Sequence, residues 1–272
     1  MNAHLLGTNI EDVFDAILHE DPSIVYIVNP TVPVLERIGT VVSRTDERAP
    51  EIRVIGETDT LKDVLDDFIV ASSIADLVEA DVLEIRSTPE HGRTSLFVTP
   101  ERVTALVEAG SQIGGLSTRD GTFPGDVYSA IESKWAGADT FGFRTPARTR
   151  IIDTLESALD ASVRADFESM LSTLESANHD ARVLDEVTIS LLVAAKNEVL
   201  LYDISKWGED VGIASKATFS RTKTKLEDCG LIDTEKVPID VGRPRLRLKF
   251  HDESLQTAEP ASIIEVARET LS

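Results

Sequence analysis

Apolar residues in the first 145 positions alternate between two kinds of run. Short extended runs are typical of strands, and runs with apolar residues three and four apart are typical of helices. The alternation predicts an α/β fold with a mainly parallel sheet, and the short gap between residues 88 and 94 predicts one antiparallel hairpin. The strand-like runs are SIVYIVNP (23–30), EIRVIGE (51–57), DVLEIRST (81–88), TSLFVTP (94–100) and QIGGLST (112–118). The helix-like runs are TVPVLERIGTVVS (31–43), DTLKDVLDDFIVASSIADLVEA (59–80) and PERVTALVEAG (100–110).

Small polar residues follow or end several of these predicted strands. Ligands of open α/β sheets bind beyond the carboxyl ends of the strands, so these residues form a candidate effector pocket for a small metabolite. Ser, Thr and Asn before a helix are also ordinary caps, and the pattern leaves both interpretations open. The candidate effector-binding residues are Asn29, Thr31, Thr58, Ser87 and Thr99.

Residues 146–178 read as one long helix or two consecutive helices with a continuous apolar stripe. The stripe could pack on its own domain or on a second copy of the chain, and we favour the second copy for part of it. A short amphipathic helix, ASIIEVARETLS, ends the chain and could do the same. The stripe consists of Ile151, Leu155, Leu159, Val163, Phe167, Met170, Leu171 and Leu174.

Three helices and two strands are predicted between residues 181 and 250. The first helix spans about 185–196 and is followed by an extended run, VLLY. Asp203 is expected to cap the second helix, which Gly212 ends, and Ser215 to cap the third. The strands GLIDTEKV and RPRLRLKF enclose the turn-rich PIDVGRP. This order is that of a winged helix-turn-helix, in which the third helix lies in the major groove of DNA.

The outer face of the third predicted helix holds small or hydrogen-bonding residues and no acid. Arg offers a bidentate fork to guanine, and Ser and Thr bind phosphates or base edges. We therefore assign Ser220, Arg221, Thr224 and Lys225 to the groove, and Lys216, Lys223, Arg243 and Arg245 to phosphates, with the cap Ser215 beside them.

The net charge of −21, with 48 acidic against 27 basic residues, taken alone argues against nucleic acid as a partner. Residues 215–250 reverse this argument, because they carry nine of the basic and only five of the acidic side chains. Such acidity, with twice as many arginines as lysines, is typical of proteins from salt-in halophiles.

Length and pattern predict four segments: an α/β sensor domain (1–145), a helical connector (146–180), a winged helix-turn-helix (181–250) and a helical tail (251–272).

Membrane, metal, cofactor and enzyme signatures are missing from the sequence. The apolar runs are too short to cross a bilayer, and no leader with a cleavage site is evident, so we expect a cytoplasmic protein. Cys229 is the only cysteine, and the five histidines have no metal-ligand spacing. There is no G-x-G-x-x-G or G-x-S-x-G motif, GSQIGGLST lacks the P-loop lysine, and HGR (91–93) lacks the H-x-K pattern.

Residues 200–250, LLYDISKWGEDVGIASKATFSRTKTKLEDCGLIDTEKVPIDVGRPRLRLKF, together with the acidic α/β front half, resemble the haloarchaeal TbsP regulators, named for TrmB suppressor protein. The resemblance extends over essentially the whole chain. It implies a DNA-binding regulator of central carbon metabolism that acts with or against the sugar-responsive regulator TrmB. TrmB-type proteins place the winged helix first, whereas this chain places it after the α/β half.

The expected function is therefore that of a homodimeric regulator that binds double-stranded DNA with its winged helix and senses a small metabolite or partner with its front half. Two alternatives remain. A winged helix also serves as a protein-interaction adaptor, and an enzyme can carry an accessory winged helix.

Overall fold

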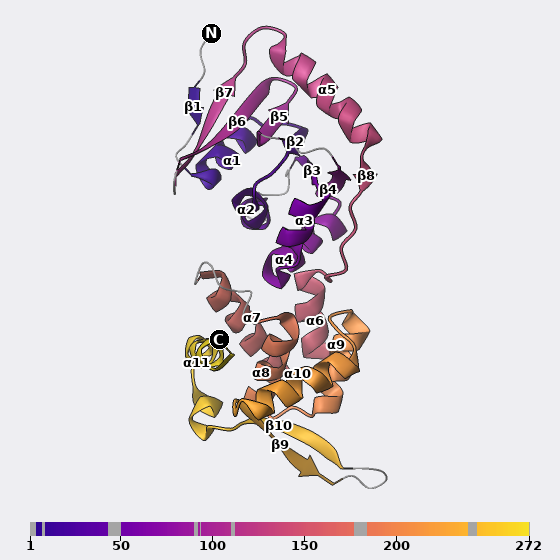
Figure 1. Cartoon of the computed structure of the whole chain (residues 1–272), viewed down its shortest axis with the longest axis vertical. Coiled ribbons are helices and arrows are strands. Elements are labelled where there is room, and N and C mark those ends of the chain that lie inside the picture. The colour runs from indigo at the N-terminus through magenta and orange to yellow at the C-terminus, as the bar shows by residue number, and fades with distance from the viewer. Residues whose placement is uncertain are drawn as a thin grey trace. The chain divides into compact units, whose positions relative to one another are not determined.

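The computed structural model describes residues 4–6, 9–42, 50–89, 92, 94–109, 112–176, 184–238 and 244–271. The contacts within the chain divide it into two compact units, whose helices and strands are labelled in Figure 1. The N-terminal unit comprises Met1–Asp66 and Ser73–Phe143, and the C-terminal unit comprises Asp67–Ser72 and Arg144–Ser272.

The N-terminal unit is a mixed α/β sheet with helices between its strands. The described strands form one eight-stranded sheet in the order β1-β7-β6-β5-β2-β3-β4-β8. The strands are β1 (His4–Leu6), β2 (Ile24–Val28), β3 (Glu51–Glu57), β4 (Leu83–Thr88), β5 (Leu96–Thr99), β6 (Arg102–Ala109), β7 (Gln112–Thr118) and β8 (Asp139–Thr140). The helices are α1 (Ile10–Leu18), α2 (Val32–Val42), α3 (Thr58–Leu65), α4 (Phe68–Glu79), whose first turn belongs to the C-terminal unit, and α5 (Phe123–Gly137).

The pairing of the strands confirms the α/β class and corrects its details. Strands β2, β3 and β4 are parallel, and every other described pairing is antiparallel, so the sheet is mixed rather than mainly parallel. The predicted hairpin between residues 83–88 and 96–99 is wrong, because β5 pairs with β2 and β6 while β4 pairs with β3 and β8.

The helix predicted over residues 100–110 is also wrong, because this segment forms β6. Val103, Leu106 and Val107 have helical spacing, which misled the prediction. Strand β6 instead pairs with β5 on one side and with β7 on the other, from Thr99↔Arg102 to Ala109↔Gln112. Hydrogen bonds to two neighbouring strands outweigh a local preference of about 1 kcal/mol or less per residue.

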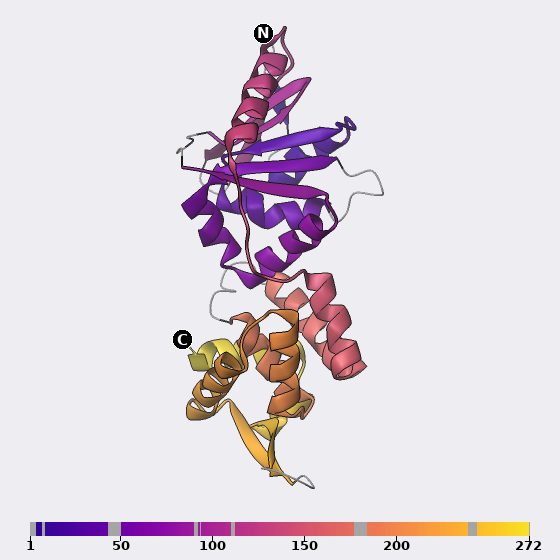
Figure 2. The ribbon, with the colours of Figure 1, turned by 90° about the vertical axis from the view of Figure 1, so that its right-hand side faces the viewer.

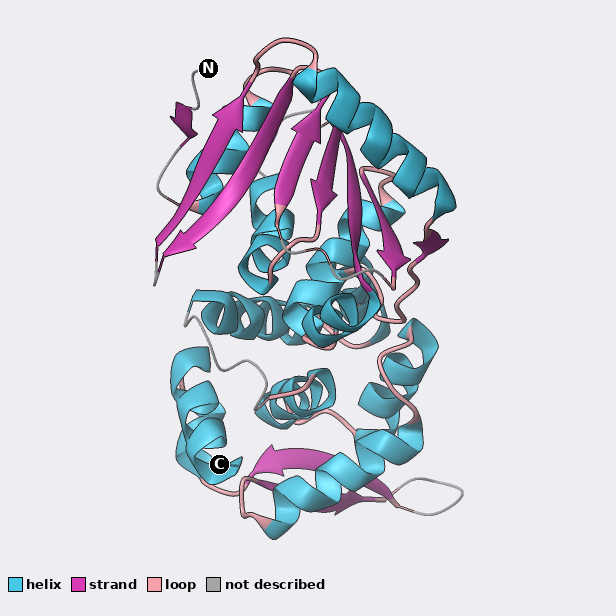
Figure 3. Cartoon of the chain, turned by 45° about the horizontal axis from the view of Figure 1, so that its top comes forward, coloured by secondary structure: helices cyan, strands magenta, loops and turns pink. Residues whose placement is uncertain are grey.

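Each face of the sheet is covered by a different set of helices. Figure 3 shows α5 along one face, where Trp135 packs against Tyr26 and Val98. Side chains alternate along a strand, so Phe97 points to the other face. There its ring contacts that of Phe14 in α1, with the centroids 4.7 Å apart. The sheet is therefore buried on both faces over its central strands.

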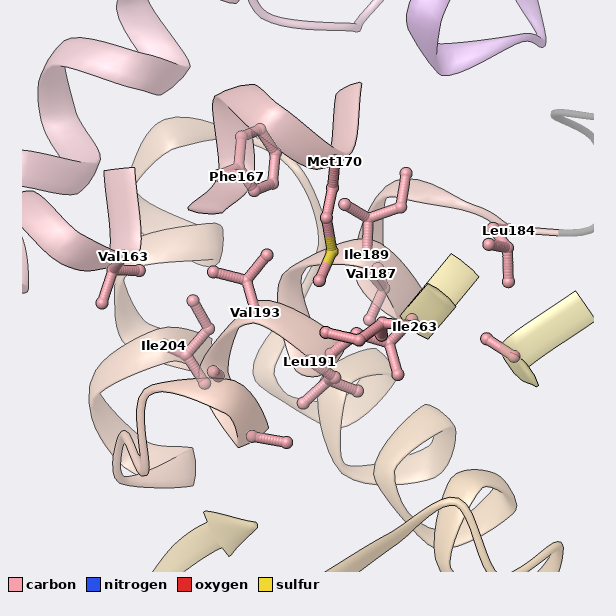
Figure 4. Packing of buried hydrophobic residues seen from close by; sticks show 14 of the residues in the cluster. Val163, Phe167, Met170, Leu184, Val187, Ile189, Leu191, Val193, Ile204 and Ile263 are labelled. Atoms are coloured by element: carbon pink, nitrogen blue, oxygen red, sulfur yellow. The ribbon is translucent and has the colours of Figure 1, made fainter. Parts of the chain in front are cut away.

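The C-terminal unit is mostly helical and is built around one hydrophobic core, part of which Figure 4 shows from close by. The predicted order of three helices and a hairpin is confirmed. The elements are α6 (Arg148–Ala158), α7 (Ala161–Ser176), α8 (Glu186–Lys196), α9 (Leu201–Val211), α10 (Lys216–Asp228), β9 (Ile232–Val237), β10 (Arg245–Phe250), η2 (Glu253–Thr257) and α11 (Pro260–Leu271).

The apolar stripe of α6 and α7 lies in this core, not on a surface open to a second copy. In Figure 4, Phe167 and Met170 of α7 lie over α8, and Ile263 of α11 joins the same cluster. The expectation that part of the stripe contacts a second copy is thus not met, because the stripe packs against other helices of the same chain. Ile151, Leu155, Val163, Phe167, Met170, Leu171 and Leu174 are buried, and Leu159 is partly buried against them.

The start of α9 differs from the prediction. Leu200 forms an isolated bridge with Arg247 of β10, and the backbone N–H of Leu248 donates to the Val199 carbonyl at 3.0 Å. The extended run therefore ends at Leu200, and α9 begins at Leu201 without a side-chain cap from Asp203. Figure 2 shows the hairpin of β9 and β10 extending from the helices of this unit.

Candidate nucleic-acid interface

Helix α10 is fixed at both ends as its sequence predicts. The Ser215 hydroxyl accepts a hydrogen bond from the Thr218 backbone N–H at 3.2 Å, and Gly230 follows the helix with φ of 73°, a conformation that favours glycine. Phe219 and Leu226 are fully buried in the core. These contacts settle which face of α10 points outward.

The outward face carries the residues assigned to the groove. Ser220, Arg221, Thr224 and Lys225 are all exposed, and the Thr224 hydroxyl donates to the Ser220 carbonyl at 3.0 Å. Arg221 donates to the Thr218 hydroxyl at 3.4 Å. Within the described part of the chain, neither Arg221 nor Lys225 has a carboxylate in ion-pair distance. The structure therefore brings these four side chains together on one surface with two uncompensated positive charges.

The residues assigned to phosphates are held differently, because each described one has a carboxylate partner. Lys216 Nζ lies 2.7 Å from Glu209 Oε2 of α9, and this hydrogen bond raises the pKa of Lys216 and lowers that of Glu209. The Arg245 guanidinium lies 3.5 Å from Asp203 Oδ1. Arg243 lies outside the described residues.

Lys223 is the most enclosed of the three described residues assigned to phosphates. Its side chain is only 12% exposed and forms an ion pair with Glu227, four residues later in α10. The other carboxylate oxygen of Glu227 accepts a hydrogen bond from the Thr234 hydroxyl of β9 at 2.8 Å. Lys223 thus belongs to a cluster that joins the end of α10 to the first strand of the hairpin.

Tyr202 is an exposed residue of this surface that the sequence analysis missed. The residue is 47% exposed at the start of α9, and the Arg245 guanidinium carbon lies 4.5 Å from the centroid of its ring. The contact joins α9 to β10, 43 residues apart, so no local pattern could reveal it. Phenol and guanidinium together offer a flat hydrogen-bonding surface beside the hairpin.

The candidate effector residues lie at two opposite edges of the N-terminal sheet, where an edge is a side of the sheet at which strands begin or end. Asn29 follows β2 in a left-handed conformation, with φ of 47°, and its N–H donates to the Ile55 carbonyl at 2.8 Å. In the parallel register Val28 pairs with Ile55, and the next residue of β3, Gly56, pairs with Ser87. Asn29 and Ser87 therefore lie at the same end of the parallel strands. Thr31, just before α2, and Thr58, at the start of α3, follow the same ends of β2 and β3.

Thr99 is separated from these four residues. Strand β5 runs antiparallel to β2, with Val28 opposite Leu96, so the carboxyl end of β5 lies at the other edge of the sheet. Thr99 is buried there, opposite Arg102. A pocket that includes all five residues is therefore wrong, because β5 runs antiparallel to β2 and ends on the other side of the sheet.

The described residues also show neither a metal-binding cluster nor a membrane-spanning helix. They contain no cluster of three or more His, Cys, Asp or Glu residues able to hold a metal ion. None of their helices has the length and apolar character required to span a bilayer.

Two family models together match residues 2–268 of the chain. The model of the N-terminal domain of TbsP-like transcriptional regulators matches residues 2–146, and the model of their C-terminal helix-turn-helix domain matches residues 147–268. No curated protein matches the chain.

A solved structure of TrmBL2, described as an archaeal chromatin protein that shows a novel mode of DNA binding, is similar over part of the chain. The two sequences are 12% identical, and the TM-score is 0.38. The similar region covers 52% of this chain and 54% of TrmBL2, so the match spans about half of each protein.

Proposed function

The chain belongs to the family of TbsP-like transcriptional regulators, and from this premise we propose that it is a sequence-specific regulator that reads its operator with α10. The observation that carries the proposal is the outward face of α10. Arg221 and Lys225 are exposed there without a described carboxylate partner, in a protein with a net charge of −21. Two exposed cations without a described ion-pair partner, on one helical face of so acidic a chain, favour a polyanionic partner.

In this proposal the residues of α10 have distinct roles. Arg221 donates two hydrogen bonds to a guanine edge, Ser220 and Thr224 bind bases or phosphates, and Lys225 donates to a base edge in the groove. Their placement on one exposed helical face supports these roles, because a helix of this width fits the major groove.

The phosphate contacts outside this face require an exchange of partners. Lys216 and Arg245 are partly exposed beside carboxylates, so DNA phosphates would replace Glu209 and Asp203 as their partners. Lys223 is the least suited of the three, because Glu227 already encloses it. We propose Tyr202, whose ring lies against the Arg245 guanidinium, as a further contact to the sugar-phosphate backbone.

We further propose that the protein acts as a homodimer on two half-sites about one DNA turn apart. The N-terminal unit would sense a small metabolite or partner, and its coupling to DNA affinity would be about 1–3 kcal/mol.

The resemblance to TbsP regulators supports central carbon metabolism as the target. Chromatin immunoprecipitation with sequencing, with and without glucose, tests this target. Occupancy of carbon-metabolism promoters that changes with glucose is the expected result.

Footprinting of the purified full-length protein on a recovered promoter tests the DNA-binding function itself. We expect one defined protected site with two halves. A protein-interaction adaptor, the other role that a winged helix serves, would protect no defined site. Protection that spreads evenly over any DNA would contradict sequence-specific recognition while leaving non-specific binding in place.

A further inference from the structure

Two arginines of the N-terminal unit converge on a single carboxylate oxygen. Arg102 begins β6 and Arg119 follows the last residue of β7, and the strands are neighbours with Val103 opposite Thr118. Both guanidinium groups donate through Nη2 to Oε1 of Glu20. Glu20 lies two residues beyond the end of α1. This trio is at the sheet edge opposite the one where Asn29 and Ser87 lie.

Arg102 is buried and only partly satisfied. The residue is 8% exposed, and its Nε and Nη1 are buried with no hydrogen-bond partner among the described residues. A guanidinium keeps its charge in a protein and offers five N–H donors, so two unused buried nitrogens carry a cost in stability. Burial also lowers the pKa of Arg102. Buried donors without acceptors call for a partner, and an anion is the partner that would also compensate the charge of the guanidinium.

Glu20 fills this role only in part. It compensates one of the two positive charges, and it offers both arginines the same oxygen although a carboxylate accepts bidentate pairs through two oxygens. Its side chain is tied to the turn after α1, where Asp21 adopts a left-handed conformation with φ of 51°. A free anion has no such tether and can turn both oxygens toward the two guanidinium forks.

We infer that Arg102 and Arg119 form a binding site for a small carboxylate anion, and that the Glu20 side chain is a built-in occupant which this ligand displaces. A carboxylate is the class we commit to, because the group the site already holds is a carboxylate. Arg119 is 52% exposed, so the site opens to solvent on its side. Thr99, opposite Arg102 in the β5–β6 pair, is the one candidate effector residue at this edge.

This inference deepens the proposal that the N-terminal unit senses a small molecule, but its test uses no DNA, so either proposal can fail alone. The experiment is isothermal titration of the full-length protein with succinate and, separately, with inorganic phosphate, at constant ionic strength against chloride. Glu20→Gln removes the internal competitor. A tethered carboxylate competes at an effective concentration of about mM or more, so this variant should bind succinate at least about tenfold more tightly than the unmodified protein.

Arg119→Ala makes the opposite change, because it removes one of the two guanidinium groups at a half-exposed position. This variant should give no succinate signal. Arg37→Ala is the matched control, because Arg37 is a surface arginine of the same unit whose carboxylate contact among the described residues is Glu11, at 3.4 Å. It should bind as the unmodified protein does.

Each outcome decides the question. If Glu20→Gln melts cooperatively and still binds no succinate, the trio only anchors α1 to the sheet. If Glu20→Gln does not fold, the unmodified protein is compared with Arg119→Ala by the rise in melting midpoint at saturating succinate. An equal rise in both overturns the site. Binding of phosphate without succinate refutes the carboxylate class.

Discussion

Glu209 Oε2 lies 2.7 Å from Lys216 Nζ, so the first basic residue of α10 is neutralised by a carboxylate of α9. The two residues are separated by the turn of the helix-turn-helix. The pair should make the affinity for DNA lower than the number of cations near α10 implies. For Lys216 to bind a phosphate, either its ion pair with Glu209 breaks or the Glu209 carboxylate lies close to the phosphates and is repelled by them.

Glu209→Gln should therefore tighten binding to specific and non-specific DNA alike. A freed Lys216 adds one phosphate contact, which should steepen the plot of log K against log salt by about one unit. The measurement is fluorescence anisotropy over a salt series. Glu265→Gln, which removes the same charge from the exposed side of α11, is the control. An unchanged slope would show that Lys216 does not reach a phosphate.

Arg221→Ala should reduce sequence-specific binding much more than non-specific binding. Loss of a bidentate contact to a base costs about 1–3 kcal/mol of discrimination, whereas loss of a phosphate contact weakens all sequences similarly. Competition between operator and random duplexes measures the ratio. Arg150→Ala, at an exposed position of α6, is the matched loss of a guanidinium. Equal losses on both duplexes would assign Arg221 to the backbone.

Gly208→Ala should destabilise the C-terminal unit by about 1–3 kcal/mol, because overpacking of a closed core costs that much. A Cβ atom at Gly208 would overlap the ring of Phe219, which joins α9 to α10. Gly137→Ala, where an added Cβ meets no atom within 4 Å, should have little effect. Thermal unfolding followed by circular dichroism compares the two, and equal midpoints would mean that α9 and α10 move apart easily.

Glu186→Gln should stabilise the protein at pH 7. Burial raises the pKa of Glu186, with Asp185 and Asp67 adding to the effect. A carboxyl whose pKa is higher in the folded state favours folding when protonated, and that advantage is lost as pH rises through the folded pKa. The variant mimics the protonated form, so its melting midpoint should exceed that of the unmodified protein at pH 7. The difference should vanish below about pH 4, where the carboxyl is protonated in both states. A constant difference at all pH values would point to packing instead.

The helix-turn-helix was predictable because its signals are local. Ser215 caps α10 and Gly212 ends α9 in the way their residue types favour, and Phe219 and Leu226 recur at a spacing that only a helix buries on one side. Each of these signals lies within a few residues of the structure it specifies.

The sheet was less predictable because its pairing joins distant residues. Strand β6 has helical spacing in the sequence and is a strand because β5 and β7 lie on either side of it. Thr99 follows a strand in the same way as Asn29, but antiparallel pairing places it at the other edge. Strand direction is a property of the assembled sheet.

By itself, the sequence determined the class of the fold, the order of the C-terminal helices and the location of the basic helical face. Only the tertiary structure decided which cations of that region keep their charge uncompensated. Glu209 and Asp203 of α9 lie within ion-pair distance of Lys216 and Arg245, whereas no described carboxylate lies within that distance of Arg221 or Lys225. The reason is that Coulomb interactions depend on distances in space, and folding sets these independently of separation along the chain.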